Sequence, residues 1–444
     1  MTHLHRRLLV LRRGTAWLGA LLLIGTLVLV GCTGTQEARS DEEGAADSAR
    51  AARAPKGPEL ADVSPSIRTI QLYRGANERQ LPVLSLRGSG GRLTLEFDLM
   101  EAAGRPLSVY FYHTDRTWRR DLSPSEYMDS FQNDNLLDYS PSRGTEVAYT
   151  HYVYRFPNDN IRFRVSGNYV LRVTEQGRPD DVLFERPFFV SEDAGPLALR
   201  VDDVPVSGQR LPSDRPAALF TPPPELQGSP FQYETCFVRN GRLDTARCTN
   251  RPRLVQQPAL EFDLYHDEAF VPTTADYFLD LSALRSGGQI AHVDRTGTPF
   301  RVELEAAYAQ FPGNAGAPPL DGQVVVDGAV RDVGEPDVEA EYVTARFSFV
   351  PPDEQPMARP VTLHGSFGET ARMEWVPARG RYEGNVLLKQ GLYEYHYRSN
   401  DPALREVLRR ALPPARGRYT AFVYYTDWSM NTDRLLAVQT VEAR

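Results

Sequence analysis

Familiar signals of catalysis and of nucleic-acid binding are missing from this 444-residue sequence. It contains no HExxH motif, no GxSxG elbow, no P-loop and no dinucleotide-binding glycine pattern. The formal net charge is −8 at pH 7, whereas nucleic-acid phosphates are bound by basic surfaces. Lysine is nearly absent, since only Lys56 and Lys389 occur and all other basic residues are arginine. We therefore predict no nucleic-acid partner and no enzyme. A catalytic triad assembled from distant residues is the alternative.

The first 31 residues have the layout of an export signal. Four arginines precede an apolar run that ends at Val30, and the small residue Gly31 stands before Cys32. A cysteine at this point predicts a lipoprotein signal peptide over 1–31, with Cys32 lipidated and becoming the new N-terminus. The alternative is an uncleaved membrane anchor, because the run is only slightly shorter than the ~20 residues that span a bilayer. In both cases the rest of the chain is exported.

A flexible tether is predicted over residues 32–65. The stretch after Cys32 has no aromatic residue and almost no β-branched residue, so it cannot bury enough surface to fold. Such a segment would hold the first folded domain away from the membrane.

The hydrophobic period changes to two after the tether. Leu93, Leu95, Phe97 and Leu99 alternate with polar residues, which predicts a half-buried strand. Long helical periods are almost absent. One short helix is predicted over 401–412, with Asp401 as its N-cap and Pro402 at its first position; two prolines end it.

Three sets of such strands are separated by segments rich in glycine and proline. They predict an all-β fold of three consecutive immunoglobulin-like β-sandwich domains. The predicted boundaries are 66–194, 195–335 and 336–444.

Cys236 and Cys248 are the cysteines that remain after Cys32. In an oxidising compartment they are the obvious disulfide pair. A two-residue turn at Asn240-Gly241 would place Cys236 opposite residue 245, so the bridge requires a longer loop or a bulge. The sequence leaves the bond open.

No metal site and no cofactor is predicted. Two cysteines without a nearby histidine pair do not fill the coordination shell of zinc. The six histidines that follow the signal peptide show no close ligand spacing; they are His113, His151, His266, His292, His364 and His396.

The segment 113–131 is dense in polar and aromatic residues and follows a strand. One interpretation is a partner-binding loop built on Trp118, Tyr127 and Phe131. The other is a long loop whose aromatic residues pack over the end of a sandwich. The same two interpretations apply to Tyr393, Tyr395 and Tyr397, because alternate tyrosines on a strand are either core residues or an exposed binding patch.

The segment 363–398 resembles the starch- and glycogen-binding relatives of the immunoglobulin sandwich, whose exposed tryptophans stack on sugar rings. The tryptophan expected after Phe367 is missing here, which leaves Trp375 alone. A surface lipoprotein that binds glycans through its C-terminal domain is therefore the alternative function.

Several motifs together resemble the plug protein family of the type IX secretion system. The first domain carries LSPSEYMDSF (122–131), the stretch 149–173 and FERPFFVSE (184–192). The third carries LLKQGLYEYHYR (387–398) and the closing stretch 419–438.

The resemblance implies a non-enzymatic secretion component. Its partner would be the large outer-membrane β-barrel translocon, whose pore it would occlude from the periplasmic side. With the lipid anchor, this predicts an outer-membrane, periplasm-facing lipoprotein. Two stretches depart from the family: residues 275–278 replace an acidic Asn-Glu-Phe-Arg-like stretch, and the helix 401–412 replaces a short acidic loop.

Overall fold

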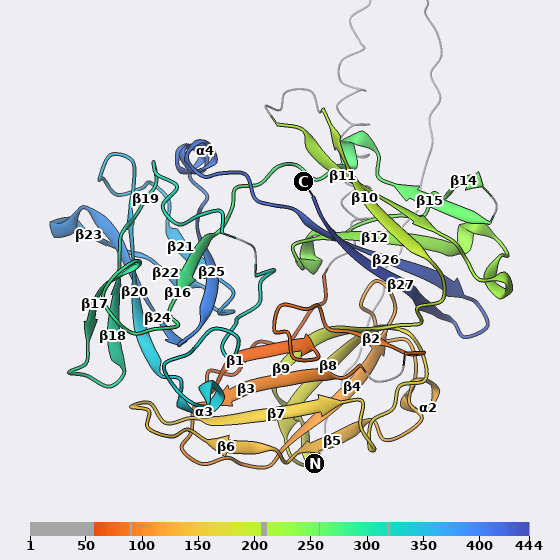
Figure 1. Cartoon of the computed structure of the whole chain (residues 1–444), viewed down its shortest axis with the longest axis horizontal. Coiled ribbons are helices and arrows are strands. Elements are labelled where there is room, and N and C mark those ends of the chain that lie inside the picture. The colour runs from red at the N-terminus through yellow and green to blue at the C-terminus, as the bar shows by residue number, and fades with distance from the viewer. Residues whose placement is uncertain (1–56, 89–90, 206–210, 257, 318–319, 444) are drawn as a thin grey trace, which may run out of the picture. The chain divides into compact units, whose positions relative to one another are not determined.

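The computed structural model describes residues 57–443 except 89–90, 206–210, 257 and 318–319. The predicted signal peptide, Cys32 and the tether up to residue 56 lie outside this part of the chain. The described residues form six β-sheets and few helices, which confirms the prediction of an all-β, sandwich-type fold. Figure 1 shows these elements in three groups of strands.

The first group is a sandwich of two sheets whose inner faces share one core of leucine, valine and aromatic side chains. One sheet has the order β1 (Ile67–Arg74), β3 (Leu93–Leu99), β7 (Thr150–Phe156), β6 (Tyr139–Pro141). The other has the order β2 (Val83–Ser85), β9 (Arg178–Ser191), β8 (Gly167–Glu175), β4 (Leu107–Thr114), β5 (Asn133–Leu136). The polypeptide passes from β5 to β6, so one edge of each sheet is made by neighbouring stretches of sequence.

The second group joins strands from two distant parts of the chain. One sheet has the order β10 (Leu197–Val204), β11 (Ser213–Phe220), β15 (Ala259–Asp263), β14 (Arg253–Gln256). The other has the order β13 (Arg247–Thr249), β12 (Tyr233–Arg239), β26 (Arg418–Asp427), β27 (Thr432–Glu442). The C-terminal hairpin thus returns to the second sandwich, where β26 lies beside β12 (Figure 1).

The third group lies between these two parts in sequence. One sheet has the order β16 (Tyr277–Asp280), β25 (Leu392–Ser399), β21 (Val361–Gly365), β22 (Ala371–Arg372). The other has the order β17 (Ile290–Asp294), β18 (Phe300–Leu304), β20 (Tyr342–Val350), β24 (Arg381–Lys389), β23 (Glu374–Val376), and β19 (Ala307–Tyr308) also pairs with β20.

This pairing corrects the predicted order of three consecutive sandwiches. The predicted boundary between 335 and 336 separates β18 from β20, yet these strands pair in parallel within one sheet. The predicted third domain also includes β26 and β27, which pair with the second sandwich. The alternation of apolar residues reports only whether a strand is half-buried, so it carries no information on which strand is its neighbour.

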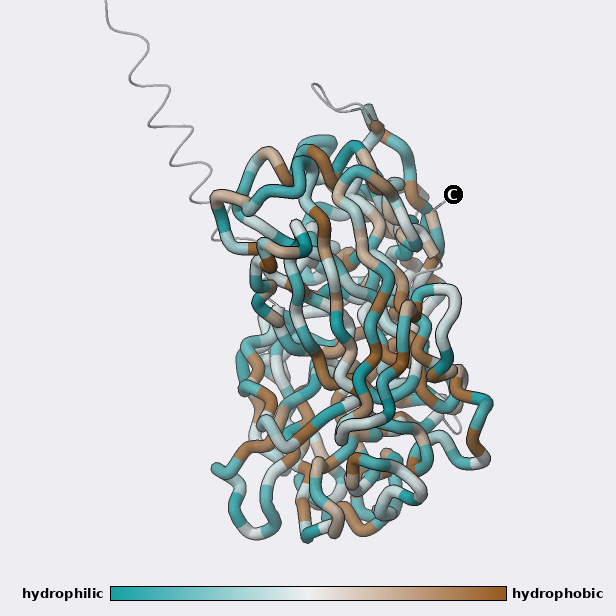
Figure 2. Tube along the Cα trace, turned by 90° about the vertical axis from the view of Figure 1, so that its left-hand side faces the viewer, coloured by the Kyte–Doolittle hydropathy of each residue, from teal (hydrophilic) through white to brown (hydrophobic). Residues whose placement is uncertain are grey.

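The alternation itself is visible along the strands in Figure 2, where hydrophobic and hydrophilic residues interchange along the chain trace. For β3 the prediction of a half-buried strand is wrong, because every residue of this strand is buried. Thr94, Glu96 and Asp98, expected to face water, are covered by other parts of the chain. Asp98 bonds to Tyr342 and Lys389 of the third sandwich, which explains its burial.

The predicted C-terminal helix is present as α4 (Pro402–Ala411). The Asp401 carboxylate accepts a hydrogen bond from the amide of Ala403 at 2.9 Å, as an N-cap does. Leu404, Leu408 and Leu412 are buried against the core of the third sandwich. Two shorter helices, α2 (Pro124–Tyr127) and α3 (Pro336–Glu339), complete the α-helical part of the described residues. No helix among the described residues is long and apolar enough to cross a membrane.

Candidate functional site

The predicted partner-binding segment 113–131 divides between buried and exposed residues. The Tyr127 side chain is only 1% exposed, and its hydroxyl donates a hydrogen bond to the carbonyl oxygen of Phe111 at 2.8 Å. Tyr127 is a core residue and its prediction as a partner contact is wrong. Trp118 is half-buried and packs edge-on against Phe189, with 5.6 Å between ring centroids. It serves the contact between the first and second sandwiches, as the alternative interpretation of this loop expects.

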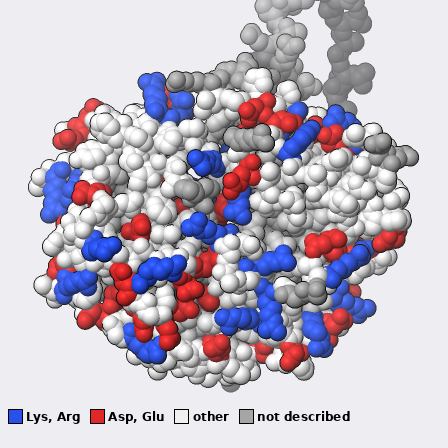
Figure 3. Space-filling view, in the orientation of Figure 1, with Lys and Arg blue, Asp and Glu red and all other residues white. Residues whose placement is uncertain are grey.

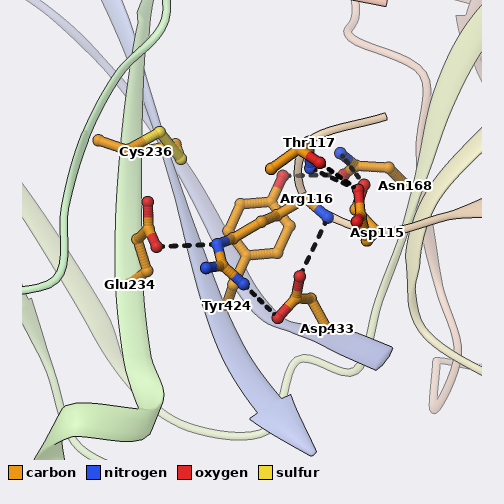
Figure 4. Close-up of a disulfide and its surroundings, with 9 residues drawn as sticks. Asp115, Arg116, Thr117, Asn168, Glu234, Cys236, Tyr424 and Asp433 are labelled. Carbon is orange, nitrogen blue, oxygen red and sulfur yellow. Dashed lines mark hydrogen bonds and ion pairs between the residues drawn. A yellow bond between two sulfur atoms is a disulfide. The ribbon is translucent and has the colours of Figure 1, made fainter. Parts of the chain in front are cut away.

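The same segment carries an arginine that ties the first sandwich to the second. The Arg116 guanidinium lies between two acidic side chains, with Nη1 2.6 Å from Asp433 of β27 and Nε 2.8 Å from Glu234 of β12 (Figure 4). Nearby, the Tyr424 hydroxyl donates to Oδ1 of Asn168 on β8 at 2.8 Å. Burial raises the pKa of Glu234, although Arg116 opposes that shift. Sequence reasoning missed this contact between the sandwiches because its members lie up to 317 residues apart.

The disulfide between Cys236 and Cys248, which the sequence leaves open, is present in the structure (Figure 4). The two cysteines stand directly opposite each other on β12 and β13. A single turn of 3₁₀ helix at Leu243–Thr245 lengthens the connection, which supplies the longer loop that the bond requires. Cys236 also packs with Phe189 and Phe422 in an apolar cluster between the two sandwiches.

Phe131 is the exposed member of the predicted trio, with 71% of its surface accessible. It stands just before β5, and Leu137, which follows β5, is 79% exposed. β5 is an edge strand of its sheet and pairs only with β4 within the described residues. Two exposed hydrophobic side chains that flank an edge strand form a surface suited to another protein chain. We name Phe131, Leu137 and β5 the β5 edge.

The C-terminal sandwich buries the residues that suggested a recognition surface. Tyr393, Tyr395 and Tyr397 are all buried in its core. Trp375 is half-buried and packs against Tyr382, with 5.1 Å between ring centroids. A sugar-stacking tryptophan presents an exposed ring, whereas Trp375 is partly covered, so the structure does not favour the glycan-binding alternative.

A cavity of about 1170 Å³ lies among the three sandwiches. Its lining includes residues from both stretches that depart from the plug family, namely residues 275–277 and one side of α4. Five arginines in its lining have no ion pair among the described residues: Arg186, Arg239, Arg398, Arg405 and Arg416. Burial lowers the pKa of Arg186 to about 10 and raises that of Glu394, which also lines the cavity, to about 7. Basic and acidic residues are interspersed over the face of the molecule in Figure 3.

A second polar cluster joins the first sandwich to the third. Asp98 accepts hydrogen bonds from the Lys389 ammonium at 2.8 Å and from the Tyr342 hydroxyl at 2.7 Å. Its other oxygen lies 2.7 Å from Nδ1 of His151. Burial, reinforced by the nearby Asp337 carboxylate, raises the pKa of Glu96 to about 7. Lys389, one of the two lysines of the chain, is therefore buried and links the third sandwich to the first.

Comparison with known proteins identifies the first sandwich. Residues 67–192 match the family described as the type 9 secretion system plug protein 1st domain. This chain contains a plug protein first domain. The match covers all the strands of the first sandwich, from β1 to β9, including the β5 edge. The plug domain thus accounts for about a quarter of the sequence, and it includes Arg116 and Asp98, which bond to the other two sandwiches.

Solved structures extend the likeness in fold beyond the plug domain. A hypothetical protein from Parabacteroides merdae superposes with a TM-score of 0.75 at 23% identity, over 87% of this chain and 100% of that one. The shared fold therefore includes all three sandwiches. Alpha-2-macroglobulins from Salmonella and E. coli give TM-scores of 0.17 and 0.18 at 10% identity, over 87% and 88% of this chain and 24% and 23% of theirs. Among curated proteins, no sequence matches significantly.

Proposed function

We propose that this chain is a non-enzymatic lipoprotein that binds the outer-membrane translocon of the type IX secretion system and occludes its pore from the periplasmic side. The observation that carries the proposal is the plug domain at 67–192. A type IX secretion-associated role follows from that domain, and pore occlusion is the specific act that we assign to it.

The tertiary structure supports occlusion because the three sandwiches are fastened to one another. Arg116 bonds the plug domain to the second sandwich through buried Asp433, and Asp98 bonds it to the third through buried Lys389. A body that blocks a wide aqueous pore must resist deformation. Charged groups that are buried and paired at module contacts provide that resistance, because separating the modules would leave the charges unpaired.

The β5 edge is the surface that we assign to the translocon. Its exposed Phe131 and Leu137 lie inside the plug domain, whereas comparably exposed aromatic residues elsewhere, such as Phe231 at 83%, lie outside it. Aromatic anchors often dominate the binding energy of protein interfaces. An unpaired strand edge also offers backbone hydrogen bonds to an incoming segment.

Affinity purification of the tagged chain from its own envelope, followed by mass spectrometry, tests the partner. We expect a very large outer-membrane β-barrel as the main protein recovered. The double variant Phe131→Ala/Leu137→Ala should reduce that recovery at least roughly tenfold, as loss of a hot spot does. The matched control is Phe231→Ala, which removes an exposed phenylalanine outside the plug domain and should leave recovery unchanged. Recovery of no barrel with the wild-type chain would refute the proposal.

The lipid anchor is tested separately at Cys32. We expect Cys32→Ser to release the protein from the membrane fraction and to remove the mass of the lipid from the N-terminal peptide. An unlipidated Cys32 in the wild-type protein would refute the anchor but leave the plug role standing. Protease digestion of intact cells distinguishes the two faces of the outer membrane, and full protection is the expected result.

A further inference from the structure

Three potential metal ligands converge where the plug domain meets the third sandwich. They are Glu96 on β3, His151 on β7 and Asp337 on α3, and one ligand atom from each lies within 4.8 Å of the other two. In the β3–β7 ladder, His151 stands opposite Asp98, two residues from Glu96 on the same face of the sheet. Asp337 arrives from a segment more than 180 residues away, so its presence depends on the docking of the two modules.

His151 is prepared as a ligand by its other neighbours. Its side chain is almost completely buried, and Nδ1 lies 2.7 Å from Oδ1 of Asp98. Because a carboxylate only accepts hydrogen bonds, Nδ1 must carry the proton of this bond. The opposite nitrogen, Nε2, is buried and has no hydrogen-bond partner among the described residues. Buried polar atoms normally have a partner, so this nitrogen requires an explanation.

Neither Glu96 nor Asp337 has an ion pair with a lysine or an arginine among the described residues. The nearest ammonium group, that of Lys389, lies 2.8 Å from Asp98 and 2.7 Å from the backbone oxygen of Asp337. Lys389 therefore bonds to the Asp98 carboxylate, which is the hydrogen-bond partner of His151, and to the main chain. Two acidic side chains brought together at low solvent exposure repel each other unless a cation or a proton lies between them.

We propose that Glu96, Nε2 of His151 and Asp337 bind one divalent transition-metal ion, and that Zn²⁺ is the ion that suits this set best. Imidazole nitrogen binds zinc at about 2.0–2.1 Å and carboxylate oxygen at about 2.0–2.2 Å, which places ligand atoms about 3–4 Å apart. Ca²⁺ and Mg²⁺ prefer sites made of oxygen alone, and the histidine disfavours them. Asp98 then acts as the carboxylate that orients a metal-bound histidine.

The bound ion would link the plug domain to the third sandwich. Two ligands come from the plug sheet, and the third comes from α3, which directly precedes β20. Loss of the metal would leave the carboxylates of Glu96 and Asp337 to repel each other. This repulsion would weaken the contact between the two sandwiches. This inference does not depend on the proposed partner, because it concerns a contact within the chain.

The first measurement is the metal content of the full chain, purified from its own envelope through a peptide tag other than polyhistidine. We expect about one equivalent of zinc by inductively coupled plasma mass spectrometry. After removal of metal with EDTA, calorimetric titration with Zn²⁺ should again show one site, and the melting temperature should rise on addition of Zn²⁺.

The variants Glu96→Gln and Asp337→Asn remove one ligand charge each and keep the side-chain size. We expect each to weaken Zn²⁺ binding at least roughly 100-fold. His292→Asn is the control, since His292 is exposed on β17 and far from the ligands in sequence. His151 is not varied because its loss would also disturb Asp98. Equal Zn²⁺ affinity in wild type and both ligand variants would overturn the proposal, as would the absence of stoichiometric binding.

X-ray absorption of the zinc-loaded wild-type chain provides a test that requires no variant to fold. The expected spectrum has one imidazole nitrogen and otherwise oxygen neighbours. A spectrum with several imidazoles would indicate binding by exposed histidines and would contradict this site.

Discussion

At the scale of single residues, a few buried charges decide how the modules hold together. Arg116 has two acidic partners, and one of them, Asp433, is almost fully buried. Removing one partner of a buried ion pair costs more than the pair itself contributes, because the remaining charge stays in a poorly solvated place.

We therefore expect Arg116→Ala to lower the free energy of unfolding by about 3 kcal/mol. Urea denaturation of the wild type and the variant measures the difference. Arg409→Ala is the matched control, because Arg409 pairs with Glu406 on the exposed side of α4 and its loss should leave the free energy of unfolding nearly unchanged. Equal effects of the two substitutions would contradict the role of Arg116 as a joint.

A second prediction at this scale concerns pH. Burial raises the pKa of Glu394 from 4.5 to about 7, so between these values the folded protein keeps a proton that the unfolded chain releases. The free energy of unfolding therefore falls as pH rises from about 4.5 to 7, by at most about 1.4 kcal/mol per pH unit for this one proton.

Glu394→Gln should flatten this dependence, which urea midpoints at pH 5, 6 and 7 would reveal. Glu406→Gln serves as the control, because hydrogen bonds from Arg409 and Arg410 lower the pKa of Glu406 to about 2, outside the window. An unchanged slope in Glu394→Gln would show that this carboxyl is ionised throughout the range.

At the scale of elements, the hairpin β12–β13 shows how a local cross-link supports a distant contact. The disulfide closes a short loop, because its cysteines have a sequence separation of 12. β12 also pairs with β26 along its whole length, so the bond lies beside the place where the C-terminal strands return.

The double variant Cys236→Ala/Cys248→Ala should lose about 3 kcal/mol of stability, as the chain-entropy estimate for a loop of this size gives. Thermal unfolding with and without a reducing agent measures the effect. The wild type should be destabilised by reduction and the variant should not respond. A variant as stable as the oxidised wild type would contradict the structural role of the bond.

At the scale of the whole molecule, the order of modules in space differs from their order in sequence. In the sequence, the third sandwich is inserted into the second, since the second sandwich begins with β10 and ends with β27. Its two halves share one core, in which Phe220 and Phe262 pack with Tyr419 and Val423. The second sandwich is therefore incomplete without β26 and β27.

A comparison of two fragments tests this arrangement. The fragment 271–413 contains every strand of the third sandwich and should unfold cooperatively in urea. The fragment 336–444 corresponds to the predicted domain but lacks β16, β17 and β18 and carries β26 and β27 without their partner β12; it should show no cooperative transition. Cooperative folding of 336–444 alone would contradict the pairing described here.

The local features of this protein could be predicted from its amino-acid sequence. The period of two in the apolar residues predicted the strands, the Asp401-Pro402 pair predicted the start of α4, and motifs of the first domain indicated the plug family. Each of these signals lies within one short stretch, where side-chain spacing and capping act directly on the backbone.

The pairing of the strands and the burial of polar residues, in contrast, depend on contacts between distant parts of the chain. Tyr127 and Phe131 stand four residues apart in one motif, yet one fills the core and the other faces solvent. Glu96, His151 and Asp337 have no ligand spacing in the sequence because the ladder of β3 and β7 and the docking of α3 bring them together. Long-range pairing depends on the matching of whole surfaces, and no short stretch of sequence contains both of the surfaces that meet.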